Sequence, residues 1–226
     1  MALPLIAALV PALTSIITTV SSVSTALAGY AATVGPIIAN IARTAGPIIK
    51  NIAIIANALL PLFNILKNGE KIDDMGERAL QAAESGIEFN EFDDFDEYVE
   101  QLRNFKLDPE KAEKRDPIVQ LVTGLGLGVI GLEEKMDLSR GSLNGLWLLP
   151  AGNEKYFTAE RLESWLKSGQ LVGDVFDYLN NQLSASDARD FEKKLETGMN
   201  ESQADELYQA LEIATAKIAE LNNTSV

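Results

Sequence analysis

Apolar residues recur with a period of eleven along residues 1–67. The segment 35–45, GPIIANIARTA, is followed directly by the segment 46–56, GPIIKNIAIIA, and eight of the eleven positions are identical. Eleven residues complete three helical turns at 3.67 residues per turn, so the repeated apolar positions stay on one face of a helix. The pattern predicts helices that lie side by side, and the side chains expected to mediate self-association or membrane contact are Ile16, Leu27, Tyr30, Val34, Ile38, Ile41, Ile49, Ile52, Leu60 and Phe63.

Two features complicate this apolar arm. Pro36 and Pro47 each follow a glycine, and a proline inside a helix removes a backbone hydrogen bond at a cost of about 3 kcal/mol. The arm is therefore either one kinked helix or a string of short helices that break at each Gly-Pro step. The positions off the stripe are mostly Ala, Ser, Thr, Ile or Asn, and a helix that is apolar all round is buried on every side by protein or lipid.

Charge divides the chain into two unlike parts. Residues 1–67 hold three basic side chains and no acid, which leaves 16 basic and 33 acidic residues for the remainder. Residues 2–42 are uncharged, whereas a bilayer span needs about 20 apolar residues. We expect the arm to be covered by copies of itself, by another chain or by a bilayer.

The remainder predicts an acidic helical body, so the fold class expected for the chain is all-α. Residues 68–138 read as acidic helices followed by a glycine-rich apolar helix. Residues 139–157 read as a loop or a small hairpin, because Asn144-Gly145 is a strong tight-turn pair. Residues 158–226 read as four helices that form a compact acidic bundle, and either Asn200 with Gln203 or Ser202 with Asp205 resembles a capping box before the last one. We expect this body to fold without residues 1–67 and to remain monomeric.

A second apolar stretch, residues 118–132, contains Gly126-x-Gly128-x-x-Gly131. That spacing superficially matches a dinucleotide-binding fingerprint, which also requires a βαβ unit and an acid about 20 residues further on. Neither is present in the sequence around residue 150. The favoured interpretation is a helix whose Gly124 and Gly128, one turn apart, allow another helix to approach closely.

Trp147 and Leu148 belong to a run of four bulky apolar residues in a loop-like setting. Such a run is either tucked into the core or offered to a partner. Core burial and contact with a partner both remain open from the sequence, and we take these two residues as candidate partner contacts.

Composition excludes several kinds of chemistry. The chain has no cysteine and no histidine, which removes thiolate chemistry, the usual general base near neutral pH and the commonest zinc ligand. A net charge of −14 without clustered Lys and Arg argues against nucleic-acid binding. The acidic segment 89–100 does not match the ligand spacing of an EF-hand. We expect no catalytic, metal or cofactor site, and no enzyme activity.

An uncharged Ala/Ile/Gly-rich front on an acidic body resembles internal virion proteins of bacteriophages and the ends of tail tape-measure proteins. The resemblance is compositional and rests on residues 1–67. It implies a non-enzymatic structural or assembly protein of a virion or injection machine, which associates with itself and with other assembly subunits. It also implies location in a virion or secreted particle, with contact to a host membrane on delivery.

Two alternatives remain. The first is a pore-forming toxin or other membrane-permeabilising protein whose arm inserts after a soluble state. The second is an integral membrane protein with a soluble acidic domain. A soluble oligomer that leaves vesicles intact favours the assembly protein, dye release favours the pore-former, and recovery only in membranes favours the integral protein.

Overall fold

The structure is a computed structural model that describes residues 14–171, 173 and 175–223. Every regular element in these residues is helical, so the expected all-α class is confirmed. After a first helix at residues 14–21, the elements are α2 (Thr25–Thr33), α3 (Gly35–Thr44), α4 (Gly46–Leu59), η1 (Leu60–Phe63), α5 (Ile72–Glu84), η2 (Phe89–Glu91), α6 (Phe95–Asn104), α7 (Pro109–Lys114), α8 (Pro117–Lys135), α9 (Leu148–Asn153), α10 (Ala159–Lys167), α11 (Val175–Leu179), α12 (Ala185–Glu196) and α13 (Glu201–Asn223).

The Gly-Pro steps break the arm into separate helices. Each of the two strong repeats begins a new helix at its glycine, which gives α3 and α4. The prolines lie in the first turn of these helices, where their missing N–H would have no intrahelical partner in any case. The structure therefore favours the string of short helices over the single kinked rod.

The glycine-rich helix α8 lies at the centre of the fold. Its most extensive contact is with α5, and it also packs against α2, α3, α4, α6 and η1. A Cβ added at Gly126 would lie 2.6 Å from Leu27 of α2, and one at Gly128 would lie 2.9 Å from Leu60 of η1. A Cβ at Gly131 would lie 2.5 Å from the Phe95 ring of α6. Different glycines of one helix thus admit different neighbours, which is how so many elements pack on α8.

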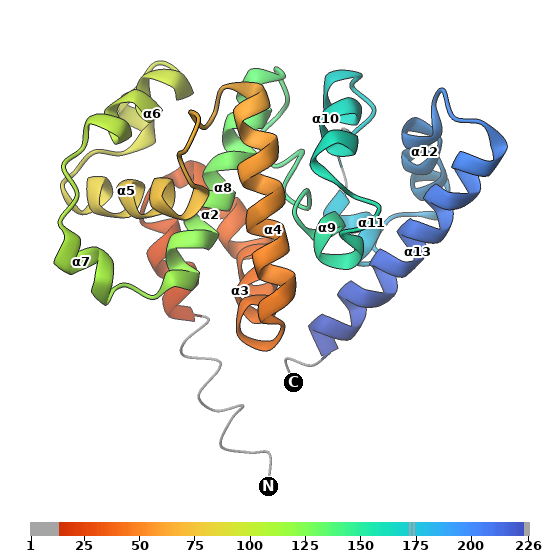
Figure 1. Ribbon diagram of the computed structural model, residues 1–226, viewed down its shortest axis with the longest axis horizontal. Helices are drawn as coiled ribbons and strands as arrows, with labels where there is room; N and C mark the ends of the chain where they lie inside the picture. Colours follow the sequence, from red (N-terminus) through yellow and green to blue (C-terminus); the bar gives the residue numbers. More distant parts are fainter. Residues whose placement is uncertain (1–13, 172, 174, 224–226) are drawn as a thin grey trace, which may run out of the picture.

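Helix α4 crosses the middle of the molecule between two groups of helices (Figure 1). It contacts α5 and α8 as well as α9 and α10. The asparagine common to both repeats ties the arm to the C-terminal part of the chain. Asn40 Nδ2 donates to the Leu221 carbonyl at 2.9 Å, and Asn51 Nδ2 donates to the carboxylate of Glu154, the residue that follows α9. One cluster of buried side chains joins residues of the arm to residues of the body.

The C-terminal part follows the local signals of its sequence closely. The Thr158 hydroxyl accepts from Arg161 N at the start of α10, and Ser184 caps α12 in the same way. Asn200 and Gln203 form the expected reciprocal capping box, with both hydrogen bonds at 3.0 Å. The expected loop or hairpin at 139–157 is wrong in its second half, because residues 148–153 form α9, which packs along α13.

Candidate interaction surface

The apolar stripe of the arm is covered by the chain itself. Nine of its ten residues are buried within the monomer, and Phe63 is partly buried against the same core. This corrects the expectation that the stripe requires copies of itself, another chain or a bilayer as its cover. The eleven-residue pattern identified the covered face correctly, but α8, α9, α10 and α13 provide that cover. In this conformation the following side chains form interior packing: Ile16, Leu27, Tyr30, Val34, Ile38, Ile41, Ile49, Ile52 and Leu60.

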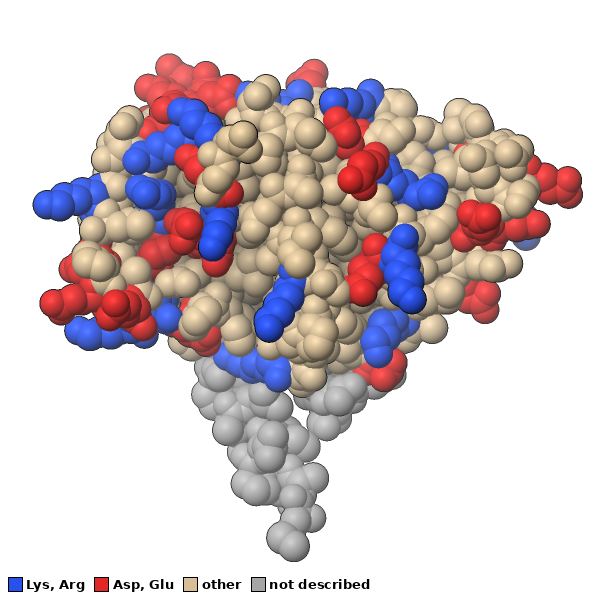
Figure 2. Space-filling model, in the orientation of Figure 1, with Lys and Arg blue, Asp and Glu red and all other residues tan. Residues whose placement is uncertain are grey.

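The opposite face of α4 and η1 is exposed and apolar. Ile54 is 64% exposed and Leu62 is 45% exposed, and both are among the few large hydrophobic residues left at the described surface. Pro47, Lys50 and Ala58 are exposed as well, and their spacing places all five on one side of the helix. We call these five residues the α4 ridge. Figure 2 shows a mainly tan band over α4, with a basic side chain on its lower part and charged side chains on both sides.

Both basic and acidic side chains lie on or beside the α4 ridge. Lys50 is the sole charged residue between positions 46 and 66. The Lys167 ammonium lies 5.7 Å from the centroid of the Phe63 ring, and it pairs with Glu163 at 2.6 Å. Glu154 accepts the hydrogen bond from Asn51. The ridge itself therefore offers aliphatic area and one cationic side chain, Lys50, and it contains no acid.

Two described segments are long and apolar enough to cross a membrane by length and composition. They are residues 46–63, of which 28% are buried, and α8, of which 72% is buried. High burial of α8 is what the core helix of a folded domain shows. The α4 segment differs because one side of it remains outside the core.

The structure places Gly124 and Gly128 at close approaches between elements. A Cβ at Gly124 would lie 1.9 Å from the Ile72 carbonyl oxygen, at the crossing of α8 and α5. At Gly128 the neighbours are the side chains of Leu60 and Trp147. The sequence indicated that a helix would pack closely on this face, but it did not identify α5 or η1 as the neighbours.

Trp147 and Leu148 lie in the core rather than at a partner-facing surface. Both are fully buried, which corrects their assignment as partner contacts. The Trp147 indole Nε1 donates to the Leu125 carbonyl oxygen at 3.0 Å. This hydrogen bond satisfies the one polar atom of a large apolar side chain, so the residue is accommodated in the interior next to α8.

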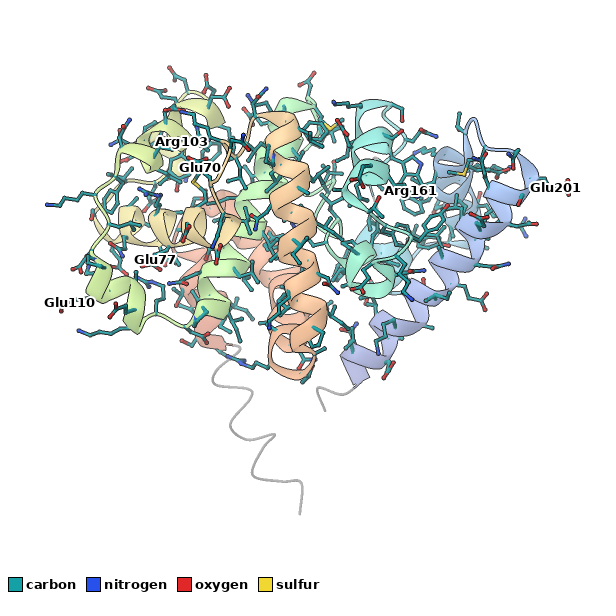
Figure 3. The ribbon with its side chains drawn as sticks, viewed as in Figure 1. Glu70, Glu77, Arg103, Glu110, Arg161 and Glu201 are labelled. Carbon is teal, nitrogen blue, oxygen red and sulfur yellow. The ribbon has the colours of Figure 1, made fainter. Side chains whose placement is uncertain are left out.

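Arg103 of α6 holds the segment that follows the arm. Its Nε donates to Glu70 Oε1 at 2.9 Å, and its Nη2 donates to the Ile65 carbonyl oxygen at 3.0 Å. Figure 3 shows Arg103 and Glu70 side by side. Burial alone would raise the pKa of Glu70, but hydrogen bonds from Arg103 and from the Lys67 backbone outweigh it and lower the pKa. An open cavity of about 560 Å³ lies beside this cluster, with Lys135 on its wall.

A second charged cluster fastens α7 and the start of α8 to α5. Arg115 Nε lies 2.7 Å from Glu77 Oε2, and Arg115 Nη2 lies 2.5 Å from Glu84 Oε1. Lys111 also pairs with Glu84, and the hydrogen bonds from Lys111 and Arg115 lower the pKa of that carboxyl. The chemistry of these clusters is ion pairing between neighbouring elements.

Buried Glu133 has a structural partner as well. Its Oε1 accepts from Leu143 N at 2.9 Å, which fixes the turns after α8 to the end of that helix. Burial raises the pKa of Glu133, and the backbone hydrogen bonds from Leu143 and Gly141 partly offset this shift. Within the described residues, no group of three or more His, Cys, Asp or Glu side chains is arranged to hold a metal ion.

Comparisons with protein-family models, with curated proteins and with solved structures give no match.

The α4 ridge is a surface feature that we did not predict from the sequence. The sequence does contain an indication of this ridge. Ile54 and Leu62 are large aliphatic residues that fall outside the repeated apolar positions of the arm. Large aliphatic residues on both sides of a helix indicate that the second side also has a nonaqueous neighbour.

Proposed function

We propose that this protein is a non-enzymatic structural or assembly component of a virion or injection machine. The described form is the stored state, in which the apolar arm is folded into its own chain. On delivery the arm leaves this core and enters a membrane. The observation that carries the proposal is that an arm with only three charged residues packs around a central apolar helix while α4 keeps one apolar side outside.

The physical basis is that the arm and α8 cover each other in water. Separation of the arm from α8 in water would expose both apolar surfaces, at a free-energy cost of about 25 cal/mol per Å² of apolar area. A bilayer offers an alternative cover, since a helix satisfies its own backbone hydrogen bonds in lipid. Contact with a membrane therefore lowers the cost of opening, whereas water alone does not.

The assignment to a particle is tested by fractionating a lysate of the cells that produce the protein on a density gradient. The chain is detected in the fractions by mass spectrometry. The proposal predicts that the chain migrates with assembled particles. Recovery only in the cell-membrane fraction would instead support an integral membrane protein. Recovery only as free soluble protein would contradict a particle component.

The insertion step is tested with a reversible cross-link between Asn51→Cys and Glu154→Cys. The chain has no native cysteine, so the pair is unique, and the two parent side chains are in contact between α4 and α9. We expect the wild type to become resistant to alkaline extraction from vesicles. The cross-linked variant should remain extractable until the cross-link is cleaved. Resistance that is unaffected by the cross-link, or a wild type that never becomes resistant, would contradict insertion of the arm.

A second candidate is a pore-forming protein. The observation that favours it is that two described segments, residues 46–63 and α8, have the length and composition of a membrane span. Two spans joined in one chain suffice for a hairpin that several copies assemble into a pore. Release of a dye from vesicles distinguishes the candidates, since the assembly protein inserts without emptying them and the pore-former empties them.

A further inference from the structure

We propose that the folded, closed form docks on the surface of a lipid bilayer through the α4 ridge, before any opening of the arm. This inference deepens the proposed function, because it names the first contact that the closed form makes. It rests on the face of α4 that the core does not use. The occupant to which we assign this face is the interfacial region of the membrane.

The ridge has the residue pattern of a helix that lies in a membrane interface. Such helices bury an apolar side at the boundary between head groups and acyl chains, and basic residues beside it contact anionic lipids. Ile54 and Leu62 supply the aliphatic side chains, and Ala58 between them leaves the surface smooth. Lys50, one turn before Ile54, is exposed and has a stem long enough to carry its ammonium to the head groups.

Charge complementarity favours lipid phosphate over a second copy of the chain. The ridge contains a lysine and no acid, so two copies that met through it would offer Lys50 no opposite charge. Beside the ridge, Glu163 is paired with Lys167, whereas Glu154 accepts a hydrogen bond from the neutral Asn51 amide and keeps its charge. Among the described residues, Lys50 makes no ion pair. A phosphate head group supplies the missing anion.

The size of the surface also argues against a dimer. A stable protein–protein interface buries roughly 800 Å² on each partner. The ridge exposes two large aliphatic side chains, each of them only in part. A bilayer has no comparable threshold, since a shallow helix contributes binding in proportion to the apolar area it inserts.

The acidic surface of the protein gives the docked molecule one orientation. The chain carries a net charge of −14, so an anionic membrane repels most of its surface. The α4 ridge has no acid, and Figure 2 shows the charged residues on its two sides. Docking through α4 therefore brings the acid-free ridge to the membrane, with the acidic side chains to either side of it.

The test uses the cross-linked Asn51→Cys/Glu154→Cys protein, so that only the closed form is present. Its binding is measured by sedimentation with vesicles of phosphatidylcholine and of phosphatidylcholine mixed with phosphatidylglycerol. We expect binding to both, tighter to the anionic vesicles and reversible on alkaline washing. Ile54→Glu in this background should weaken binding about tenfold or more, which corresponds to about 1.4 kcal/mol. Lys50→Gln should remove the preference for the anionic vesicles.

Ile213→Glu is the matched control. Ile213 is 55% exposed on α13, so the same substitution is made at a similarly exposed isoleucine on a different element. We expect Ile213→Glu to leave vesicle binding unchanged, and all variants to keep the helical circular dichroism of the parent. Equal loss in Ile213→Glu and Ile54→Glu would overturn the proposal.

Two further outcomes would also overturn it. One is a cross-linked protein that does not bind either kind of vesicle. The other is a wild-type dimer that Ile54→Glu dissociates without any change in lipid binding, which would make the ridge an interface between copies. The results separate this inference from the proposed function. If the closed form binds reversibly but the arm never inserts, the insertion step is contradicted and docking is not. If the arm inserts but the closed form does not bind, docking is contradicted and insertion is not.

Discussion

Gly76 of α5 and Gly124 of α8 lie against each other where the two helices cross. A Cβ built on Gly76 would lie 2.7 Å from Gly124 N and 1.9 Å from the Gln120 carbonyl oxygen. At such distances the obstacle is backbone, which cannot rotate away as a side chain does. The two glycines therefore set the distance between α5 and α8, the pair of helices with the most extensive contact in the fold.

Gly124→Ala tests this crossing. The added methyl group would overlap the Ile72 carbonyl oxygen of α5, so we expect a loss of about 3 kcal/mol in the free energy of unfolding, or failure to fold. Gly29→Ala in α2 is the control, because nothing lies within 4 Å of its added Cβ. Helix propensity predicts that Gly29→Ala is neutral or stabilising by up to about 1 kcal/mol. Chemical denaturation gives the free energy of unfolding of both variants. Equal effects would show that α5 and α8 can move apart at their crossing without loss of stability.

Arg103→Met tests the cluster that holds the segment after η1. The variant keeps an apolar stem but removes the guanidinium that donates to the Ile65 carbonyl and to Glu70, and we expect a loss of about 2 kcal/mol. Lys114→Met is the control, since Lys114 forms an exposed pair with Glu110 at 3.6 Å and such pairs contribute less than about 1 kcal/mol. A similar loss of stability in both variants would show that the Arg103 contacts have no special weight.

The same cluster predicts an acid dependence. The pKa of Glu70 is lower in the folded chain than in the unfolded chain. The stability from this group is therefore fully present above the unfolded pKa of about 4.3, and it is lost as the pH falls through the folded pKa. Thermal unfolding of the wild type between pH 3 and pH 5, about the range of this titration, should show a steeper decline than that of Arg103→Met. Parallel curves would contradict the assignment.

Glu133 predicts the opposite dependence. Burial raises its pKa above the unfolded value, so its contribution to stability declines as the pH rises from the unfolded pKa through the folded pKa. Glu133→Gln keeps an oxygen that accepts from Leu143 N and removes the charge, and we expect its stability at pH 7 to equal or exceed that of the wild type. Glu133→Ala leaves that N–H without an acceptor, and a loss of about 1–3 kcal/mol is expected. If Gln proves as destabilising as Ala, the carboxylate charge is itself required.

Removal of residues 1–67 now has a prediction opposite to that from the sequence. The sequence indicated a self-sufficient body, because its caps and apolar faces are complete locally. In the structure, Leu60 and Leu27 cover glycines of α8, and α4 packs on α9 and α10. The body without the arm should therefore lose its cooperative thermal transition and expose α8. A fragment 68–226 that melts cooperatively with native-like helicity would show that the core is divisible.

The difference between the two expectations has a physical origin. The eleven-residue pattern states which face of each helix is covered, and Ile38, Ile41 and Ile52 are indeed buried. The pattern does not state what covers that face, since lipid, another copy and the same chain all satisfy it equally. The sequence predicted structure best where neighbouring residues determine it, as at the Asn200–Gln203 capping box.

Long-range packing accounts for the rest of what the sequence did not provide. The glycines of α8 predicted a close approach, but several of the side chains that fill the space come from helices far away in the chain, such as Leu27 of α2 and Phe95 of α6. Trp147 was a candidate partner contact because it belongs to a bulky apolar run in a loop-like setting. Its burial depends on α8, where the Leu125 carbonyl accepts the indole N–H. The sequence shows that Ile54 and Leu62 lie outside the repeated stripe, but only the packing of the core shows that these two side chains are exposed.

The central claim is that, in water, the apolar arm is part of the core of a single chain. The most direct test is amide hydrogen exchange on protein prepared without detergent, whose oligomeric state has been determined from its mass in solution. The account predicts a monomer in which the α8 amides and the inner residues of α3 and α4 exchange slowly and in one cooperative unit. Rapid exchange throughout residues 14–67 of a monomer, or protection there only in oligomers or with lipid, would contradict it.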